Sequence, residues 1–314
     1  MRKALVIGLN NYPTAPLYGC INDAKEISRL LEYNQDHTIN FSVQLITDER
    51  QKVDKVNLKK SIVELFNGDG TVLLYFSGHG LNNESGGYIV TPDYQKYDEG
   101  ISMAEILNFA NNSKAKNKII ILDCCYSGNF GNFNVLQNQA ALIGSGVTIL
   151  TACKSDETSV EKHGRGLFTN LLIDALEGGA ADLSGNVTPG SIYWYVDKAL
   201  GPWEQRPVFK TNVTAYTPIR QLKPPIPIEK LRKLIVYFQS QDDEYHLDPT
   251  YEFTEPLAIP KHVEILKDLQ KFVSVGLVKP VEEEHMYFAA INSKSCKLTT
   301  LGKCYWHFIT DKRI

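Results

Sequence analysis

The chain has 314 residues, of which 43% are hydrophobic and 22% charged, and this is enough for one sizeable folded core and a smaller unit. Its formal net charge of −3 gives no general reason to expect binding to nucleic acid or to a membrane surface. No apolar stretch approaches the length of a membrane span, and the amino-terminal segment lacks the long apolar region and cleavage site of a signal peptide.

The cysteines are few and scattered. They lack the paired spacing of a zinc site and are too widely separated to suggest a disulfide framework. We therefore expect a cytoplasmic protein, because thiols stay reduced in that compartment. A strand-like segment starts at residue 3, so we also expect no amino-terminal recruitment domain. The cysteines are Cys20, Cys124, Cys125, Cys153, Cys296 and Cys304.

Apolar runs and segments of helical periodicity alternate along the first 200 residues. This alternation predicts an α/β fold in which helices flank a mostly parallel sheet. Asn22 or Asp23 is the expected cap of the first helix. The expected strands cover 3–9, 41–46, 72–76, 86–91, 119–122, 147–153 and 206–210, and the expected helices cover 24–33, 56–66, 101–110, 166–176 and 191–200.

Two of the apolar runs end in reactive side chains. The run 72–76 leads into Ser-Gly-His-Gly, which contains His79, and the run 119–122 leads into Asp-Cys-Cys, which contains Cys125. Open α/β sheets place their chemistry at the carboxyl ends of their strands. A thiol and an imidazole at two such ends are the parts of a cysteine nucleophile and its base. Either motif alone would read as an ordinary core thiol or a turn histidine, but their combination argues against that alternative.

These two turns resemble the catalytic motifs of the caspase-like cysteine peptidases, in particular those of metacaspases and bacterial caspase homologues. The resemblance implies a caspase-like six-stranded sheet, with Cys125 as the nucleophile and His79 as the base. It also implies that backbone N–H groups of Gly80 and Cys125 bind the oxyanion. The resemblance extends over about residues 1 to 215. In its second half, Cys153 is expected to be a core thiol and His163 a loop residue.

The segment Gly-Cys-x-Asn-Asp-Ala resembles the part of metacaspases that contributes to the primary specificity pocket. The resemblance implies a pocket formed by Cys20, Asp23, Ser77 and Asp123. Two buried carboxylates require a cationic partner, because an unpaired buried charge is costly. An Arg or Lys side chain of the substrate supplies that charge. The implied activity is cleavage after Arg or Lys, not after Asp; the plainer alternative is that Asp23 only caps a helix.

Two departures from the family pattern carry further expectations. Many metacaspases bind calcium through a cluster that includes an Asp pair; here the pair is missing, although Asp93, Asp98 and Glu99 lie nearby. We therefore expect no cofactor and no dependence on calcium. No Lys or Arg lies between Cys125 and Lys154, so an enzyme specific for basic residues cannot process itself there. Activation is then expected to be conformational.

A proline-rich linker begins at residue 222, which predicts a peptidase domain over 1–221 and a second domain over 222–314. The second domain resembles a winged helix, a smaller α+β fold. Its basic residues are spread and interrupted by Glu282, Glu283 and Glu284, so we do not expect nucleic acid as a partner. The expected elements are helices over 228–238 and 262–275 and a hairpin formed by 286–291 and 296–298.

The leading hypothesis is a cysteine endopeptidase that cuts proteins after Arg or Lys. The resemblance suggests a bacterial defence effector, for example in antiviral defence or cell death. A ligand such as a nucleotide messenger, or a partner protein, would activate it through residues 222–314. Two alternatives remain open at this point: a nucleic-acid-binding regulator built on the terminal domain, and a catalytically silent caspase-like scaffold.

Overall fold

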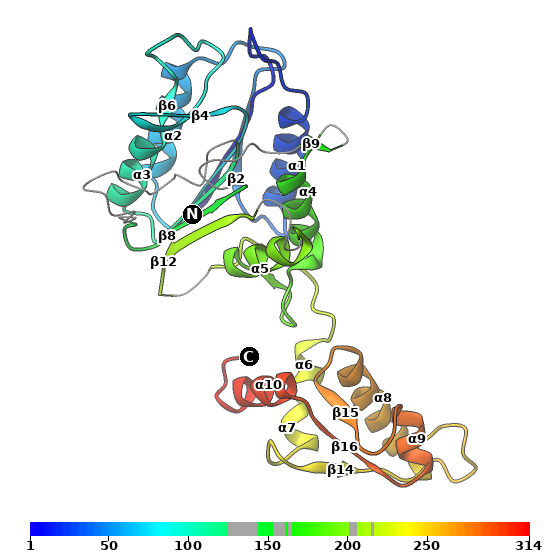
Figure 1. Cartoon of the computed structure of the whole chain (residues 1–314). Helices are drawn as coiled ribbons and strands as arrows, with labels where there is room; N and C mark the ends of the chain where they lie inside the picture. Colours follow the sequence, from blue (N-terminus) through cyan, green and yellow to red (C-terminus); the bar gives the residue numbers. More distant parts are fainter. Residues whose placement is uncertain (125–142, 153–160, 163–164, 201–205, 215–216) are drawn as a thin grey trace. The chain divides into compact units, whose positions relative to one another are not determined.

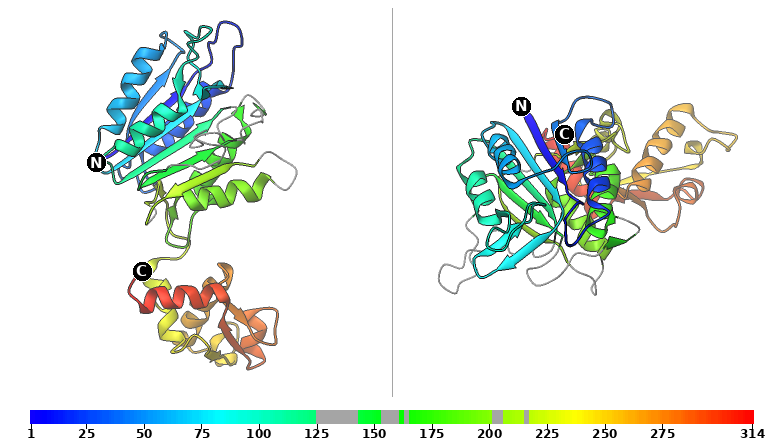
Figure 2. Two further views of the ribbon diagram at one scale, coloured as in Figure 1. Left: turned by 60° about the vertical axis from the view of Figure 1, so that its left-hand side comes forward. Right: turned by 90° about the horizontal axis from the view of Figure 1, so that it is seen from above.

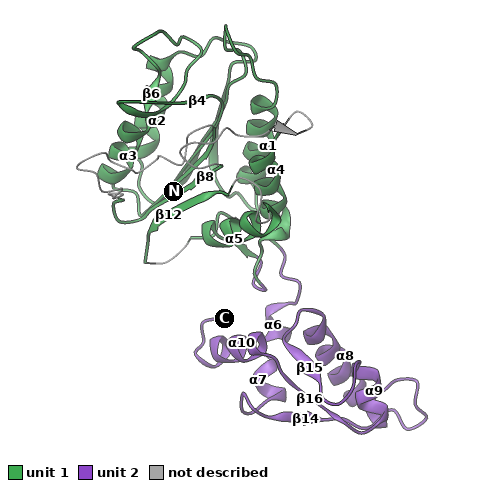
Figure 3. Ribbon diagram, in the orientation of Figure 1, with its two compact units in different colours: residues 1–182, 186–222 green, residues 183–185, 223–314 purple. Residues whose placement is uncertain are grey.

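The computed structural model describes residues 1–124, 143–152, 161–162, 165–200, 206–214 and 217–314 (Figure 1). The chain divides into two compact units (Figure 3). Unit 1 comprises residues 1–182 and 186–222, and unit 2 comprises residues 183–185 and 223–314. The functions assigned above to the two parts of the chain stay predictions.

The centre of unit 1, as far as the structure describes it, is a six-stranded sheet of order β12-β8-β7-β3-β1-β2. Strand β12 is antiparallel to its neighbour, and the other neighbouring strands are parallel. This arrangement confirms the predicted α/β class. The strands are β1 (Arg2–Gly8), β2 (Ser42–Thr47), β3 (Thr71–Ser77), β7 (Asn117–Asp123), β8 (Val147–Thr151) and β12 (Val208–Asn212).

Helices cover both faces of this sheet because its central strands are apolar on both sides (Figures 1 and 2). Helices α2 (Lys55–Phe66) and α3 (Met103–Asn112) bury one face, against side chains such as Phe76. The opposite face, which carries Tyr75, packs against three other helices. These are α1 (Cys20–Glu32), α4 (Leu167–Asp174), which continues as a π-helical turn (Ala175–Gly179), and α5 (Pro189–Leu200).

Short strands complete unit 1. A small antiparallel sheet follows β3 and includes residues 101–102, which were predicted as the start of a helix. These residues pair with β5 instead, and helix α3 begins after them. The short strands are β4 (Gly80–Asn83), β5 (Gly86–Ile89), β6 (Ile101–Ser102), β9 (Glu161–Lys162), β10 (Arg165–Gly166), β11 (Asn186–Val187) and β13 (Arg220–Gln221).

The predicted cap of helix α1 is wrong. The helix begins at Cys20 with Gly19 as its N-cap, so Asn22 and Asp23 lie inside the first turn. The carboxylate of Asp23 accepts a hydrogen bond from the backbone N–H of Gly166, far away in the sequence. Tertiary contact, not helix capping, therefore places this acid.

Unit 2 has a core of its own and a three-stranded antiparallel sheet of order β14-β16-β15. The predicted hairpin is wrong, because residues 286–291 form a helix. Met286, Ala289 and Ala290 are buried, and this i, i+3, i+4 spacing is helical. The predicted helix over 228–238 is two short helices. The elements are α6 (Ile228–Leu231), α7 (Leu234–Tyr237), β14 (Glu244–His246), a 3₁₀ turn (Pro249–Tyr251), α8 (Pro260–Ser274), β15 (Val278–Pro280), α9 (Met286–Ile291), β16 (Ser295–Leu298) and α10 (Thr300–Thr310).

The likeness of unit 2 to a winged helix stays a prediction. Among the described residues of the whole chain, no helix is both long and apolar enough to span a bilayer.

A buried carboxylate joins helix α8 to the two short helices of unit 2. Asp268 is 3% exposed and accepts hydrogen bonds from Lys230 Nζ (2.9 Å), Lys233 Nζ (2.6 Å) and Tyr237 Oη (2.9 Å). Burial on its own would raise the pKa of Asp268, but these donors outweigh it and hold the pKa below its usual value. The network therefore stabilises unit 2 while Asp268 is ionised.

We expect Asp268→Asn to lower the free energy of unfolding of unit 2 by about 1–3 kcal/mol at neutral pH, because it leaves charged donors without their acceptor. Since the folded-state pKa is depressed, the stabilisation is present above about pH 4 and is lost as the pH falls below that value. Urea denaturation at several pH values measures both effects. Glu264→Gln, which removes the exposed ion pair with Lys267, is the matched control and should change little. Equal effects of the two variants would contradict this role of Asp268.

Candidate active site

Three strands of the central sheet end in one row. Gly8 of β1 pairs with Ser77 of β3, and Ser77 pairs with Asp123 of β7. The side chains of such a row project from the same face of the sheet, here the face covered by α1 and α4. A Cβ on Gly8 would lie 2.2 Å from the carbonyl oxygen of Cys20. The absence of a side chain at Gly8 therefore allows the first turn of α1 to lie directly on this row.

The two acids of the predicted pocket meet at Gly166. The N–H of Gly166 donates to Asp23 Oδ2 over 3.1 Å, and a Cβ on Gly166 would lie 2.2 Å from Asp123 Oδ2. Asp23 is 1% exposed and Asp123 is 5% exposed. Burial, and then the charges of Asp123 and Asp23, raise the pKa of Tyr75 well above its ordinary value. Two carboxylates from distant parts of the chain thus share one buried region.

The other two residues of the predicted pocket also lie in this part of unit 1. Cys20 is the first residue of α1 and Ser77 the last residue of β3, and both are buried. The carbonyl of Ser77 accepts a hydrogen bond from the N–H of Leu9, which ties the ends of β1 and β3 together. The structure thus brings all four predicted pocket residues to the carboxyl ends of β1, β3 and β7 and the start of α1. Their role in binding substrate stays a prediction.

Two hydroxyl groups that the sequence did not single out contact this region. Thr169 Oγ1 donates to Asp123 Oδ2 over 2.6 Å, and Tyr75 Oη lies 2.6 Å from Thr169 Oγ1. Both side chains are fully buried. Thr169 lies in the sequence Gly-Leu-Phe-Thr, residues 166–169, within the region of the family resemblance, but this sequence carries no chemistry of its own.

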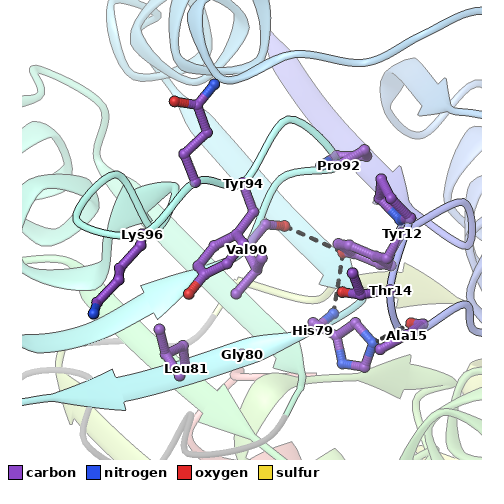
Figure 4. A pocket seen from close by; sticks show the side chains of 12 residues that line it. Tyr12, Thr14, Ala15, His79, Gly80, Leu81, Val90, Pro92, Tyr94 and Lys96 are labelled. Atoms are coloured by element: carbon purple, nitrogen blue, oxygen red, sulfur yellow. Dashed lines mark hydrogen bonds between the residues drawn. The ribbon is translucent and has the colours of Figure 1, made fainter.

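His79 follows strand β3 and is held by one hydrogen bond of its ring and one of its backbone N–H (Figure 4). Its Nε2 lies 2.6 Å from the carbonyl oxygen of Ala15, and its N–H donates to Tyr12 Oη over 3.1 Å. The Tyr12 and His79 rings pack edge to face, with centroids 4.5 Å apart. A carbonyl oxygen can only accept, so Nε2 carries a proton in this arrangement and Nδ1 is the basic atom of the neutral ring.

The loop that supplies Ala15 is fixed by a buried acid. Asp48 accepts hydrogen bonds from the N–H groups of Asn10 (3.0 Å) and Asn11 (2.7 Å). Further along the loop, the N–H of Leu17 donates to the carbonyl of Asn10. These bonds close the loop on itself and keep the carbonyl of Ala15 beside the imidazole.

A cavity of about 490 Å³ lies beside His79 and is lined mainly by apolar side chains (Figure 4). Tyr12 and Val90 form part of its wall, and the hydroxyl of Tyr12 donates to the carbonyl of Val90 over 3.2 Å. Gly80, the first residue of β4, also lines it. A cavity of this size has room for one or two amino-acid side chains next to the histidine.

Of the two adjacent cysteines, only Cys124 lies among the described residues. Cys124 is fully buried in the core under α2 and α3, on the face of the sheet opposite Asp123. Cys125 lies outside the described residues, as do Cys153, Lys154 and His163. Asp123 lies two residues before Cys125, and Ser77 lies two residues before His79. Asp123 and Ser77 are paired in the sheet.

Two of the acids considered for calcium contact Lys55. Asp93 accepts a hydrogen bond from the backbone N–H of Lys55, and Asp98 forms an ion pair with the ammonium group of Lys55. No group of three or more His, Cys, Asp or Glu side chains in the described parts of the chain is placed to hold a metal ion. Independence from calcium stays a prediction.

A mostly parallel sheet with a histidine after one central strand and an Asp-Cys-Cys sequence at the end of the next is the pattern expected of a caspase-like cysteine peptidase. The caspase domain model matches residues 1–217, and the chain belongs to this family. The crystal structure of protein GSU0716 from Geobacter sulfurreducens is similar in fold, with a TM-score of 0.52 at 15% identity, over 71% of this chain and 99% of that one. No curated protein matches the chain. The predicted class is thus confirmed, and assignment to the metacaspase branch stays a prediction.

Proposed function

We propose that this protein is a cysteine endopeptidase that cleaves proteins after Arg or Lys, with Cys125 as nucleophile and His79 as base. The observation that carries the proposal is the pair of buried carboxylates, Asp23 and Asp123, on either side of Gly166. Two buried acids beside the strand ends suit a guanidinium or ammonium group and repel an acidic side chain. Cys20 and Ser77 complete the proposed pocket.

In the first half of the reaction, Nδ1 of His79 takes the proton of the Cys125 thiol, and the thiolate attacks the carbonyl carbon of the substrate. The oxyanion is bound by the backbone N–H groups of Gly80 and Cys125. As the C–N bond breaks, the imidazolium gives its proton to the leaving amine, and a thioester remains. The carbonyl of Ala15 supports these steps because it holds the ring in one orientation.

In the second half, a water molecule gives its proton to His79 and attacks the thioester carbon. The C–S bond then breaks, the new carboxylic acid leaves, and the proton returns to the thiolate. No cofactor takes part in either half. The buried Cys124 is a poor candidate for the nucleophile, since its thiol is packed in the core on the other face of the sheet.

The proposal includes activation by a change of conformation. No Lys or Arg lies between Cys125 and Lys154, so a cut after a basic residue cannot occur in that segment. Unit 2 has its own core and is the proposed receptor for an activating partner protein or ligand. The proposed ligand is, for example, a nucleotide. A pocket of about 460 Å³ in unit 2 contains Lys279, Lys297 and Lys303, but Glu244 and Asp242 also line it and form ion pairs with Lys297 and Lys303. The proposal also includes a role as a defence or cell-death effector, which the family resemblance suggests.

Matched fluorogenic peptides that end in Arg, Lys or Asp test the proposal, with and without calcium. We expect cleavage after Arg and Lys, none after Asp, and no effect of calcium. Cleavage after Asp would overturn the pocket assignment, and a calcium requirement would contradict the expectation of no cofactor. If the full chain is silent, the same assay on residues 1–222 follows, because unit 1 has its own core. Activity of that fragment alone would identify unit 2 as an inhibitor, and continued lack of activity would point to a missing ligand or partner.

A further inference from the structure

We propose that Thr169 and Tyr75 are positioning residues that orient the carboxylate of Asp123 and thereby make the pocket prefer Arg over Lys. This inference rests on the proposed function and concerns the same site. Its basis is a chain of two hydrogen bonds in the buried region under α4, each 2.6 Å long. Neither Thr169 nor Tyr75 needs to touch the substrate.

The direction of this chain follows from the capacity of each group. An ionised carboxylate only accepts hydrogen bonds, so the hydroxyl of Thr169 donates its single proton to the bond with Asp123 Oδ2. Its oxygen can then only accept from Tyr75, whose phenol must be the donor. Burial and the nearby acids raise the pKa of Tyr75 well above its ordinary value, so the phenol keeps its proton. Three groups from β3, α4 and β7 thus form one chain that ends on the carboxylate.

A fixed carboxylate matters more for one basic side chain than for the other. A guanidinium binds a carboxylate through two parallel N–H···O bonds, which require the two planes to match. An ammonium group is a compact charge with rotatable donors and tolerates a rotated carboxylate. The backbone of Gly166 also lies against Asp123 Oδ2, since even an added Cβ would be 2.2 Å from it. The hydroxyl chain and Gly166 together leave Asp123 little freedom to rotate.

The test compares full-length wild type with Thr169→Val, Thr169→Ser and Tyr75→Phe, using matched peptides with Arg or Lys before the cut. Thr169→Val removes the hydroxyl and should lower the ratio of kcat/KM for Arg to that for Lys about tenfold. Thr169→Ser keeps the hydroxyl and should hold the ratio close to that of wild type. Tyr75→Phe removes only the outer donor and should give an intermediate ratio. Circular dichroism and melting temperatures establish that each variant is folded.

A second readout needs no turnover: the rise in melting temperature that acetyl-arginine amide or acetyl-lysine amide causes in each protein. A larger rise with the arginine compound in wild type, lost in Thr169→Val and kept in Thr169→Ser, would support the inference. An unchanged ratio in Thr169→Val, an equal loss for both substrates, or a defect in Thr169→Ser of the same size would overturn it while leaving the proposed function intact. If neither wild type nor residues 1–222 cleaves after Arg or Lys, and neither responds to either amide, the proposed function fails and this inference with it.

Discussion

Cys125→Ala and His79→Ala should each lower kcat/KM for peptides ending in Arg by at least about 1,000-fold. The first substitution removes the atom that forms the thioester. The second removes both the base that generates the thiolate and the acid that protonates the leaving amine. The loss should be as large in the double variant as in either single one, because the two groups act as a unit. Steady-state kinetics on the three variants measure these effects.

Cys124→Ala is the matched control for this prediction. Its thiol neighbours that of Cys125 in the sequence but is fully buried in the core under α2 and α3. We expect this variant to keep its activity and to lose some stability, because a small cavity remains in the core. Loss of activity in Cys124→Ala together with retained activity in Cys125→Ala would make Cys124 the nucleophile and would contradict the assignment of Cys125.

Gly166→Ala should reduce cleavage after both Arg and Lys by about 100-fold or more. Gly166 has a φ of −64°, which any residue adopts, so an alanine meets no resistance from the backbone. The obstacle is space, since the new Cβ would lie 2.2 Å from Asp123 Oδ2. The carboxylate must move, and a displacement of about 1 Å at a binding group is enough for an effect of this size. The measurement is kcat/KM on matched Arg and Lys peptides.

Gly87→Ala is the control for added volume at a glycine. A Cβ at this position would meet the sulfur of Met103, the flexible end of a side chain that can give way. We expect its activity to stay close to that of wild type. If Gly166→Ala also remains fully active, while its melting temperature is unchanged, Asp123 does not bind the substrate in the way proposed.

Much of unit 1 could be predicted from the sequence because its signals are local. The apolar runs of β3 and β7 are buried on both faces and are followed by polar turns, and this pattern alone places His79 and Asp123 at strand ends. Unit 2 was harder. Met286 to Ile291 is a short apolar run that suits a strand or a helix equally well, and only its burial pattern shows that it is a helix.

By itself, the sequence determined the α/β class, the family and the presence of a histidine and an Asp-Cys-Cys motif after central strands, because strand and turn signals are local. Only the tertiary structure decided how the acids are held. Asp23 contacts Gly166 across 143 residues, Tyr75 contacts Thr169 across 94, and Thr169 contacts Asp123 across 46. These contacts exist because α1 and α4 pack side by side on one face of the sheet, and no local pattern in the chain specifies which residues such packing brings together.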